Sequence, residues 1–120
     1  MSEATHLSQS DCVFCRIVSG QIPADIVYRT DEVIAFRDIE PVAPLHLLVI
    51  PVEHVARLTD AAASEGLLGR LLATCAALAQ QHGLAEHGYR VVVNDGEHGG
   101  QVVQHLHFHL IGGRPLGGIG

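Results

Sequence analysis

Three histidines at alternate positions near the end of the chain are the residues best suited to do chemistry. His105, His107 and His109 lie in the segment Gln104–Ile111 and are separated by apolar residues. Side chains of a β-strand point alternately to opposite faces, so a strand here would place the imidazoles on one face and the apolar side chains on the other. An imidazole can attack phosphorus while its neighbours donate hydrogen bonds to the phosphoryl oxygens. The pattern therefore predicts nucleophilic chemistry on an anionic substrate.

Two other interpretations of this histidine segment stay open at the level of residue types. The side chains could be solvated polar groups on the exposed face of an antiparallel strand, where Thr, Lys or Glu is more usual. Alternate strand histidines can also bind one zinc ion together. A metal site on the strand is thus a second hypothesis beside the catalytic one.

A further pair of possible metal ligands is Cys12 and Cys15, which are separated by two residues. This spacing fits a zinc site, a redox-active dithiol or two cysteines of a core. The third cysteine, Cys75, lies on the apolar face of a predicted helix and is expected to be a small core residue. The N-terminus shows no export signal, so the three cysteines do not predict a disulfide framework.

Length and composition predict one globular domain. The chain has 120 residues, of which 48% are hydrophobic, enough for a single core. Seven Lys and Arg against thirteen Asp and Glu give a net charge of −6, which argues against binding duplex nucleic acid through its phosphates. No apolar stretch approaches the roughly 20 residues needed to cross a bilayer, and no signal or transit peptide is visible. We therefore expect a cytoplasmic protein that binds neither duplex nucleic acid nor a membrane.

The elements that must position these residues are two helices and about five strands. Asp11 is expected to cap a short helix, Cys12–Ser19, which Gly20 ends. A long helix with a leucine-rich face is predicted from about Thr59 to His82. Runs rich in β-branched and aromatic residues predict the strands, which are Asp25–Arg29, Val33–Arg37, His46–Ile50, Tyr89–Asn94 and Val103–Ile111. The pattern predicts an α+β fold with an antiparallel sheet, preceded by a flexible tail of residues 1–10.

Several motifs match one known family in order along the chain. The histidine segment resembles the His-φ-His-φ-His-φ-φ signature of the histidine triad (HIT) superfamily, where φ is an apolar residue. The flanking runs Gly99–Gln101 and Gly112–Pro115 are similar to its histidine triad nucleotide-binding (HINT) branch. Further matching segments are Phe14–Val18, Ile22–Ala24, Ala35–Ile39, Pro41–His46, Val49–Pro51 and Tyr89–Asn94. The resemblance covers residues 11–117 and implies a HIT-like domain there, with tails at 1–10 and 118–120.

The resemblance implies a role for four histidines in catalysis. His107 corresponds to the nucleophile that takes the nucleotidyl group, and His109 to the residue that binds the phosphate. His105 and His46 correspond to residues that support the imidazole network behind the nucleophile.

The resemblance also implies a set of substrate-binding residues. Asp38 corresponds to the acid that accepts both ribose hydroxyls, which suits a short side chain that only accepts hydrogen bonds. Asn94 corresponds to an asparagine on the phosphate side, and Gln101 is assigned to the same site. The apolar slot for a purine ring is implied to comprise Phe14, Ile17, Ile22, Phe36 and Ile39.

The resemblance further implies a structural zinc ion. Many prokaryotic members pair the two cysteines with two histidines, which correspond here to Cys12, Cys15, His54 and His105. Two thiolates and two imidazoles make a closed tetrahedral site, so one Zn²⁺ per chain is expected and none is required for the chemistry. If His105 binds zinc, its ring cannot relay protons to His107, and only an orienting role remains for it.

The activity that the resemblance implies is that of a purine nucleoside phosphoramidase or related nucleotidyl hydrolase. The nucleotidyl group passes to a histidine and then to water, which releases a nucleoside monophosphate. The alternatives are a dinucleoside polyphosphate hydrolase, against which Gly112-Gly113-Arg114 speaks, and a nucleotide- or zinc-binding regulator with little turnover. The implied partners are an AMP-like purine nucleotide and a second copy of the chain in a homodimer.

The chain departs from the family at two places. Val102 stands where many members have a serine that bonds the phosphate or the leaving nitrogen, and valine can do neither. The C-terminal tail, which helps to shape substrate choice in many members, is short here. Both departures concern the leaving group.

Overall fold

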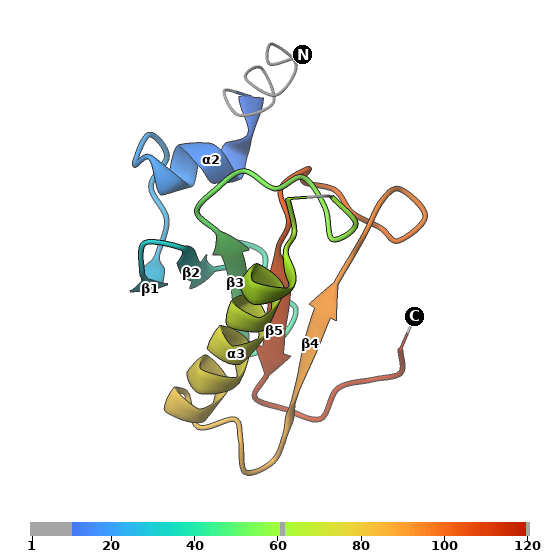
Figure 1. Cartoon of the computed structure of the whole chain (residues 1–120). Coiled ribbons are helices and arrows are strands. Elements are labelled where there is room, and N and C mark those ends of the chain that lie inside the picture. Colours follow the sequence, from blue (N-terminus) through green and yellow to red (C-terminus); the bar gives the residue numbers. More distant parts are fainter. Residues whose placement is uncertain (1–10, 61, 120) are drawn as a thin grey trace.

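The computed structural model describes residues 11–60 and 62–119, so the predicted tail of residues 1–10 lies outside the described residues. Five strands form one antiparallel sheet in the order β1-β2-β3-β5-β4 (Figure 1). The strands are β1 (Ile26–Arg29), β2 (Val33–Arg37), β3 (Leu45–Pro51), β4 (Tyr89–Val93) and β5 (Phe108–Gly112). The helices are α2 (Val13–Val18) and α3 (Glu65–Gln81). The predicted α+β fold with about five antiparallel strands is confirmed.

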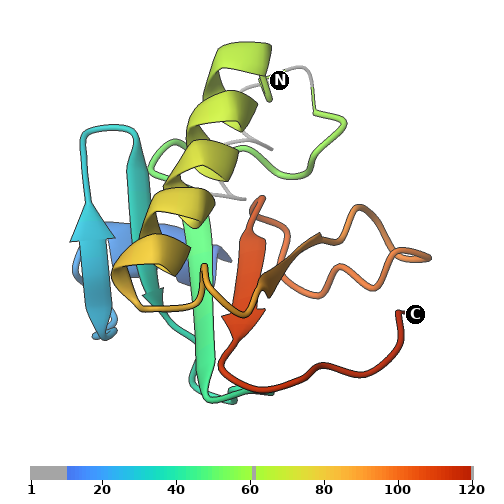
Figure 2. The same cartoon turned by 90° about the horizontal axis from the view of Figure 1, so that it is seen from below.

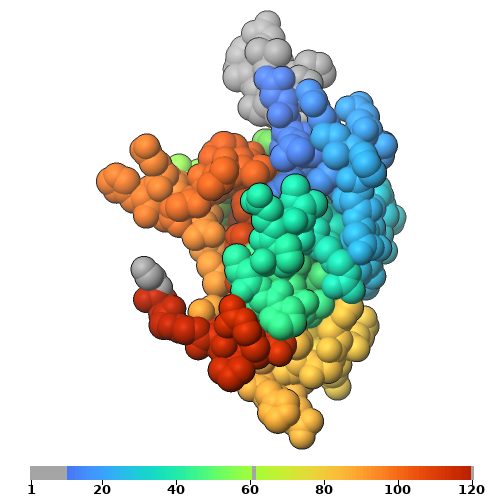
Figure 3. Space-filling view, turned by 180° about the vertical axis from the view of Figure 1, so that it is seen from behind, coloured from blue at the N-terminus to red at the C-terminus, as the bar shows by residue number. Residues whose placement is uncertain are grey.

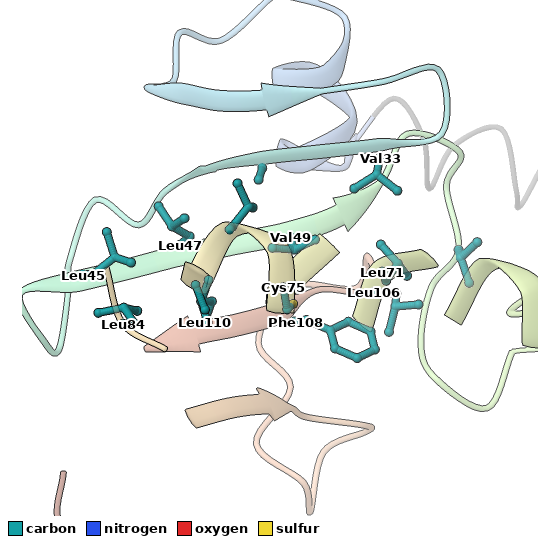
Figure 4. Packing of buried hydrophobic residues seen from close by; sticks show 14 residues of the cluster. Val33, Leu45, Leu47, Val49, Leu71, Cys75, Leu84, Leu106, Phe108 and Leu110 are labelled. Carbon is teal, nitrogen blue, oxygen red and sulfur yellow. The ribbon is translucent and has the colours of Figure 1, made fainter. Parts of the chain in front are cut away.

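The main core lies between α3 and one face of the sheet, along which the helix runs (Figure 2). Leu47 and Val49 of β3 and Leu110 of β5 are fully buried there against Leu71 and Cys75 of α3 (Figure 4). The prediction that Cys75 is a small core residue is therefore confirmed. Because residues two apart in a strand share a face, His46, Leu48 and Ile50 of β3 must face the other side.

A smaller cluster of buried residues covers part of that second face. Ile34 and Phe36 of β2 and Leu48 and Ile50 of β3 pack against α2, which contributes Phe14 and Ile17. α2 is one and a half turns long, so its position depends on this packing rather than on helix propensity. The helix therefore forms one wall of whatever lies beside it on this face.

The start of α2 differs from the prediction. The residue that caps it is Cys12, whose Sγ accepts a hydrogen bond from the Cys15 amide at 3.4 Å, and the predicted cap Asp11 is wrong. The predicted stop at Gly20 is confirmed, since this residue has a φ of 84°, which favours glycine. The cap matters because it places the sulfur of Cys12 beside that of Cys15.

The long helix begins later than the spacing of leucines predicts. α3 starts at Glu65, capped by the Ser64 hydroxyl, which accepts from the Leu67 amide at 3.2 Å. The serine can satisfy an amide of the first turn, whereas the described residues from Thr59 to Ala63 form turns and loop. Neither described helix is long and apolar enough to cross a membrane.

The last predicted strand is too long at its start. Residues 103–107 precede β5, and their backbone binds loops instead of β4. The Leu106 amide donates to the Val55 carbonyl at 2.6 Å, and the Val103 carbonyl accepts from the Gln101 side chain at 3.0 Å. The alternation of side chains nevertheless persists, because Leu106, like Phe108, joins the core under α3.

Candidate active site

A cavity of about 610 Å³ opens on the face of the sheet opposite α3. Figure 3 shows this face, which is hollowed between the blue-green segment before β3 and the orange loop after β4. Ten residues predicted from the sequence line the cavity together: Phe14, Ile17, Ile22, Phe36, Asp38, Ile39, His46, Asn94, His107 and His109. His105 and Gln101 are not among its lining residues.

His107 is held as a neutral imidazole with one free ring nitrogen. Its Nδ1 lies 2.7 Å from the His105 carbonyl oxygen, and because a carbonyl only accepts, Nδ1 must carry the proton. The other ring nitrogen, Nε2, therefore keeps its lone pair. Burial lowers the pKa of His107 below its usual range, which keeps the ring neutral at neutral pH, with one proton on Nδ1 and none on Nε2. The ring is thus prepared to attack an electrophile through Nε2.

A second chain of hydrogen bonds fixes the protonation of His109. The Val42 amide donates to Nδ1 of His46 at 3.2 Å, so the proton of His46 sits on Nε2. That nitrogen lies 2.9 Å from Nδ1 of His109 and donates to it, which leaves the proton of neutral His109 on Nε2. The ring of His109 is therefore a hydrogen-bond donor, not a nucleophile.

Burial keeps His46 and His109 neutral. Burial, with the positive charge that His107 or His46 would carry, lowers the pKa of His109 to about 4. Burial also lowers the pKa of His46, although the Asp38 carboxylate partly opposes this. The rings of His107 and His109 have centroids 5.1 Å apart, so a nucleophile and a donor can act on one small group.

His105 is turned away from this pair, contrary to the expectation that all three imidazoles act together. Its Nε2 lies 2.9 Å from the Pro51 carbonyl and must donate to it, so Nδ1 keeps the lone pair. That nitrogen faces Cys12 Sγ at 3.3 Å and Cys15 Sγ at 3.5 Å. The contact from His105 to His107 is made by its backbone carbonyl, so its ring relays no proton to His107.

Two polar residues stand at opposite sides of the cavity. Asp38 follows β2, and its Oδ1 accepts from the Glu40 amide at 2.8 Å while its Oδ2 lies 3.4 Å from His46 Nε2. These contacts leave lone pairs on both oxygens for further donors. Asn94 follows β4, and its Nδ2 donates to the Gly99 carbonyl at 2.7 Å, which aligns its amide with the loop after it.

The apolar wall of the cavity comes from α2 and β2. The rings of Phe14 and Phe36 meet edge to face with centroids 5.5 Å apart, and Ile17 lies beside them in the same buried cluster. Phe14 also presents its ring to His107, with centroids 5.2 Å apart and planes at 88°. Ile39 lies at the mouth and is 94% exposed. A flat apolar slot of this kind can hold an aromatic ring next to the histidines.

Gln101 supports the loop instead of facing the cavity. Its buried Nε2 donates to the carbonyls of Ala56, at 2.8 Å, and Val103, at 3.0 Å. Its Oε1 accepts from the Gly96 amide at 2.9 Å. Both ends of this amide are thus engaged with the backbone, which does not favour the substrate contact expected for Gln101.

The loop after Asn94 is further fixed by an ion pair and a close backbone approach. The Arg57 guanidinium pairs with the Asp95 carboxylate across the two loops that Gln101 joins. A Cβ atom at Gly99 would lie 2.5 Å from the Asp95 carbonyl oxygen, so only glycine fits there. The loop therefore holds Asn94 in one place.

The predicted zinc ligands come together in a separate cluster behind the cavity. Ligand atoms of Cys12, Cys15, His54 and His105 all lie within 4.8 Å of one another. Nδ1 of His54 is 3.1 Å from Cys15 Sγ, and Nδ1 of His105 is an unprotonated nitrogen facing both sulfurs. Burial and the neighbouring Cys12 raise the pKa of the Cys15 thiol to about 12, so a cation is needed to make it a thiolate. The donor set and its geometry fit a tetrahedral zinc ion.

A second group of possible ligands, Asp38, His46 and His109, is also compact. The Val42 amide keeps Nδ1 of His46 unprotonated, so its Nε2 carries a proton where a metal ion would have to bind. This group is therefore a hydrogen-bond relay. In the described part of the chain, neither compact group combines two histidines of the triad, which gives no support to a zinc ion bound by alternate strand histidines.

The contributors that the sequence did not reveal are mostly backbone groups. The Val42 amide, the Pro51 carbonyl and the His105 carbonyl decide which ring nitrogens carry protons. Residue type says nothing about such groups, and only the position of Val42 four residues before His46 could have suggested one of them.

Comparison with known proteins agrees with this arrangement. Residues 19–116 match the HIT domain. A purine nucleoside phosphoramidase from Escherichia coli (strain K12) is 49% identical over 108 residues, which cover 89% of this chain and 91% of that protein. A HIT family hydrolase from Legionella pneumophila Philadelphia 1 has 47% identity and a TM-score of 0.84, covering 88% of this chain and 95% of that one. A Zn-bound histidine triad family protein from Mycobacterium smegmatis has 34% identity and a TM-score of 0.79, covering 88% and 77% of the two chains.

Proposed function

Because the chain belongs to the HIT domain family, we propose that it is a hydrolase of purine nucleoside phosphoramidates that works through a nucleotidyl-His107 intermediate. The observation that carries this proposal is the hydrogen bond from His107 Nδ1 to the His105 carbonyl. It leaves Nε2 unprotonated on a ring that lines the cavity, where His109 offers a donor. The similarity to a purine nucleoside phosphoramidase supports the choice of substrate.

The cavity orients the nucleotide from both ends. The purine enters the slot between Phe14, Ile17 and Phe36, and Asp38 accepts hydrogen bonds from both ribose hydroxyls. Asn94 lies on the phosphate side with its amide fixed by the loop. This orientation brings the α-phosphorus to His107 Nε2 as a near-attack arrangement.

The first chemical step forms a bond from His107 Nε2 to the α-phosphorus and breaks the P–N bond. The leaving nitrogen takes a proton from solvent at the open mouth, because Val102 has none to give, and departs as an amine. His109 Nε2–H donates to a phosphoryl oxygen while charge accumulates there. The second step is attack by water on the same phosphorus, which breaks the P–Nε2 bond and releases the nucleoside monophosphate.

The charge of the cavity favours this reaction over cleavage of a dinucleoside polyphosphate. Among the described residues that line the cavity, Arg37 is the one Lys or Arg, and it is paired with Asp25 at 3.1 Å. A polyphosphate would bring several negative charges next to Asp38 and Glu40 with no other cationic side chain of the lining to balance them. The intact nucleophile likewise favours an enzyme over a regulator with little turnover.

Rapid mixing with adenosine 5′-phosphoramidate tests the proposal. We expect the intact protein to gain the mass of one adenylyl group within a turnover, and peptide mapping to place it on His107. His107→Ala should lose at least about a thousandfold in turnover while still binding AMP. His98→Ala, which removes an exposed histidine of the neighbouring loop, is the matched control and should keep full activity. An adenylyl group on another residue, or unimpaired hydrolysis by His107→Ala, would overturn the proposal.

The cluster of Cys12, Cys15, His54 and His105 is proposed to hold one structural zinc ion per chain. Its fit to tetrahedral coordination and the Zn-bound relative from Mycobacterium smegmatis support this. When bound, the ion would cross-link α2 to the loop after β3 and to the triad segment. A closed site with four protein ligands leaves no coordination position at which water could be activated. Metal analysis should find one zinc per chain, lost in a Cys12→Ser/Cys15→Ser variant and retained in Cys75→Ser. Zinc retained by the double variant would refute the site.

We further propose that the domain spans residues 11–117, that the protein acts in the cytoplasm and that two copies form a homodimer. The match over residues 19–116 supports the first statement, the location is the expectation drawn from the sequence, and the homodimer rests on the sequence resemblance. Sedimentation at micromolar concentration should give a species of twice the chain mass of 12.8 kDa. A monomer under these conditions would contradict the dimer.

A further inference from the structure

His105 contacts both the Cys/His cluster and His107 of the cavity wall, through different groups. Its ring is held between Cys12 Sγ at 3.3 Å and the Pro51 carbonyl at 2.9 Å, and it is fully buried. Its carbonyl oxygen accepts from Nδ1 of His107 at 2.7 Å. Movement of the His105 ring would therefore move the acceptor that fixes the tautomer of His107.

Phe14 makes a second connection between the same two sites. It lies between the two cysteines on α2, the helix that Cys12 caps. Its ring meets His105 edge-on with centroids 5.9 Å apart at 69°, and His107 with centroids 5.2 Å apart at 88°. Both histidine rings thus rest on a side chain whose backbone is flanked by two of the four cluster residues.

We propose that the Cys/His cluster, when it holds zinc, is a positioning device for the nucleophile, acting on His107 through the His105 carbonyl and the Phe14 ring. The inference rests on the proposed function, in which His107 attacks phosphorus. It goes beyond a structural zinc site because it assigns the cluster an effect on the turnover number. His105 and Phe14 are positioning residues in this proposal.

The physical consequence of losing the metal concerns the proton of His107. Without a cation, the four residues lose the coordination bonds that would join them, so packing and hydrogen bonds alone hold α2 and the His105 backbone, and both gain freedom. His107 then loses a fixed acceptor for Nδ1–H, and part of the population carries its proton on Nε2, where it cannot attack. A looser α2 should also weaken the purine slot at Phe14 and Ile17, but Asp38 and Asn94 lie on segments outside the cluster, so binding of AMP should suffer less than turnover.

His54→Asn is the most selective variant for testing the positioning role of the cluster, because His54 belongs to the cluster but does not line the cavity. We expect its zinc content to fall, and the turnover number with adenosine 5′-phosphoramidate to fall by about tenfold or more, with a smaller change in KM. In ¹⁵N NMR spectra of the unaltered, nucleotide-free protein, the chemical shifts of the two His107 ring nitrogens should differ as expected for one protonated and one unprotonated nitrogen. In the variant the two chemical shifts should move toward their average.

Two further variants separate positioning from loss of stability. His54→Cys replaces the imidazole by a thiolate, which is also a zinc ligand, and should restore the metal, the separated ¹⁵N signals and the turnover number. Leu78→Ala removes a buried side chain of α3 that belongs to the core on the other face of the sheet. It should lower the unfolding temperature while leaving both the ¹⁵N signals and the turnover number unchanged.

The outcomes for His54→Asn and for the unaltered protein decide whether the cluster positions His107. Unchanged ¹⁵N signals and turnover in a zinc-free His54→Asn protein would overturn the inference, and so would an unaltered protein that holds no zinc. If His54→Asn does not fold, the unaltered protein treated with a chelator gives the same ¹⁵N comparison. A protein that forms no adenylyl-His107 even with zinc bound would instead refute the proposed function, which distinguishes the two failures.

Discussion

Replacement of Asp38 by asparagine tests how the cavity recognises a ribose. Its carboxylate is largely shielded, with 19% of the side chain exposed, and already accepts one backbone amide at 2.8 Å. A hydrogen bond from a ribose hydroxyl to this carboxylate should contribute about 1.5–3 kcal/mol, as is typical when one partner is charged. The unaltered protein should therefore bind 2′-deoxy-AMP about 10- to 150-fold more weakly than AMP.

The variant should lose most of this discrimination. The asparagine side chain would offer one accepting oxygen and a donating NH₂ group, so one of the two hydroxyls would meet a donor instead of an acceptor. We expect AMP to bind to Asp38→Asn about tenfold or more weakly and the preference over 2′-deoxy-AMP to shrink to about threefold. The Asp38 carboxylate only opposes the lowering of the pKa values of His107 and His109, so its loss leaves both rings neutral, and the turnover number should fall less than the affinity for AMP.

Isothermal titration of AMP, 2′-deoxy-AMP and 3′-deoxy-AMP measures these effects directly. Asp31→Asn is a matched control, because Asp31 is an exposed carboxylate between β1 and β2 and does not line the catalytic cavity. It should leave all three affinities unchanged. Equal affinity of the unaltered protein for AMP and 2′-deoxy-AMP would refute the assignment of Asp38 to the ribose.

Three further predictions concern the stability of the protein, two of them at the site and one in the core under α3. The pKa of His109 is lowered to about 4, so between the ordinary value of 6.5 and 4 only the unfolded chain is protonated there, and the free energy of unfolding falls as the pH decreases through this range. The full shift corresponds to about 3 kcal/mol, of which we expect about half for a half-buried ring, and urea titrations at pH 7 and pH 4 should show this loss reduced in His109→Gln. Gln101→Ala removes three hydrogen bonds to the backbone and should lower the free energy of unfolding by about 2–3 kcal/mol and weaken AMP binding. Gln101→Glu would bury a carboxylate oxygen against the Ala56 and Val103 carbonyls and should cost at least as much at neutral pH, and a Gln101→Glu protein as stable as the unaltered chain would contradict the role given to the amide. Leu71→Ala should lower the free energy of unfolding by about 2–5 kcal/mol in urea titrations without changing the affinity for AMP, and a loss of affinity would show that the two faces of the sheet are not independent.

Residue types and spacing predicted which side chains meet, but not how they are protonated. The triad pattern and the resemblance brought His107, His109, Asp38 and the apolar slot to one cavity, as the structure shows. The two cysteines and His54 were likewise expected beside His105. The grouping of His107 with His109 follows from alternation along a strand, whereas the places of Asp38, of the apolar slot and of the four cluster residues were implied by the family resemblance.

The remaining features depend on contacts between distant backbone groups. The strand predicted from Val103 was too long because the residues before β5 bind the loop at Val55, a partner that becomes adjacent only in the folded chain. The inward turn of the Gln101 amide has the same origin, since it satisfies backbone groups from two loops. Local propensity carries no information about these partners.

The register of β3 shows why the chemistry and the core can coexist in so small a domain. Leu47 pairs with Leu110 and Leu48 with His109 across the strands, so alternate positions supply the core under α3 and the cavity on the opposite face. A shift of one residue would place His46 in the core, where its two nitrogens would lose Val42 and His109 as partners. The cost of burying an unsatisfied imidazole therefore opposes a one-residue shift of this register. The hydrogen bonds that prepare His109 as a donor also help to specify the fold.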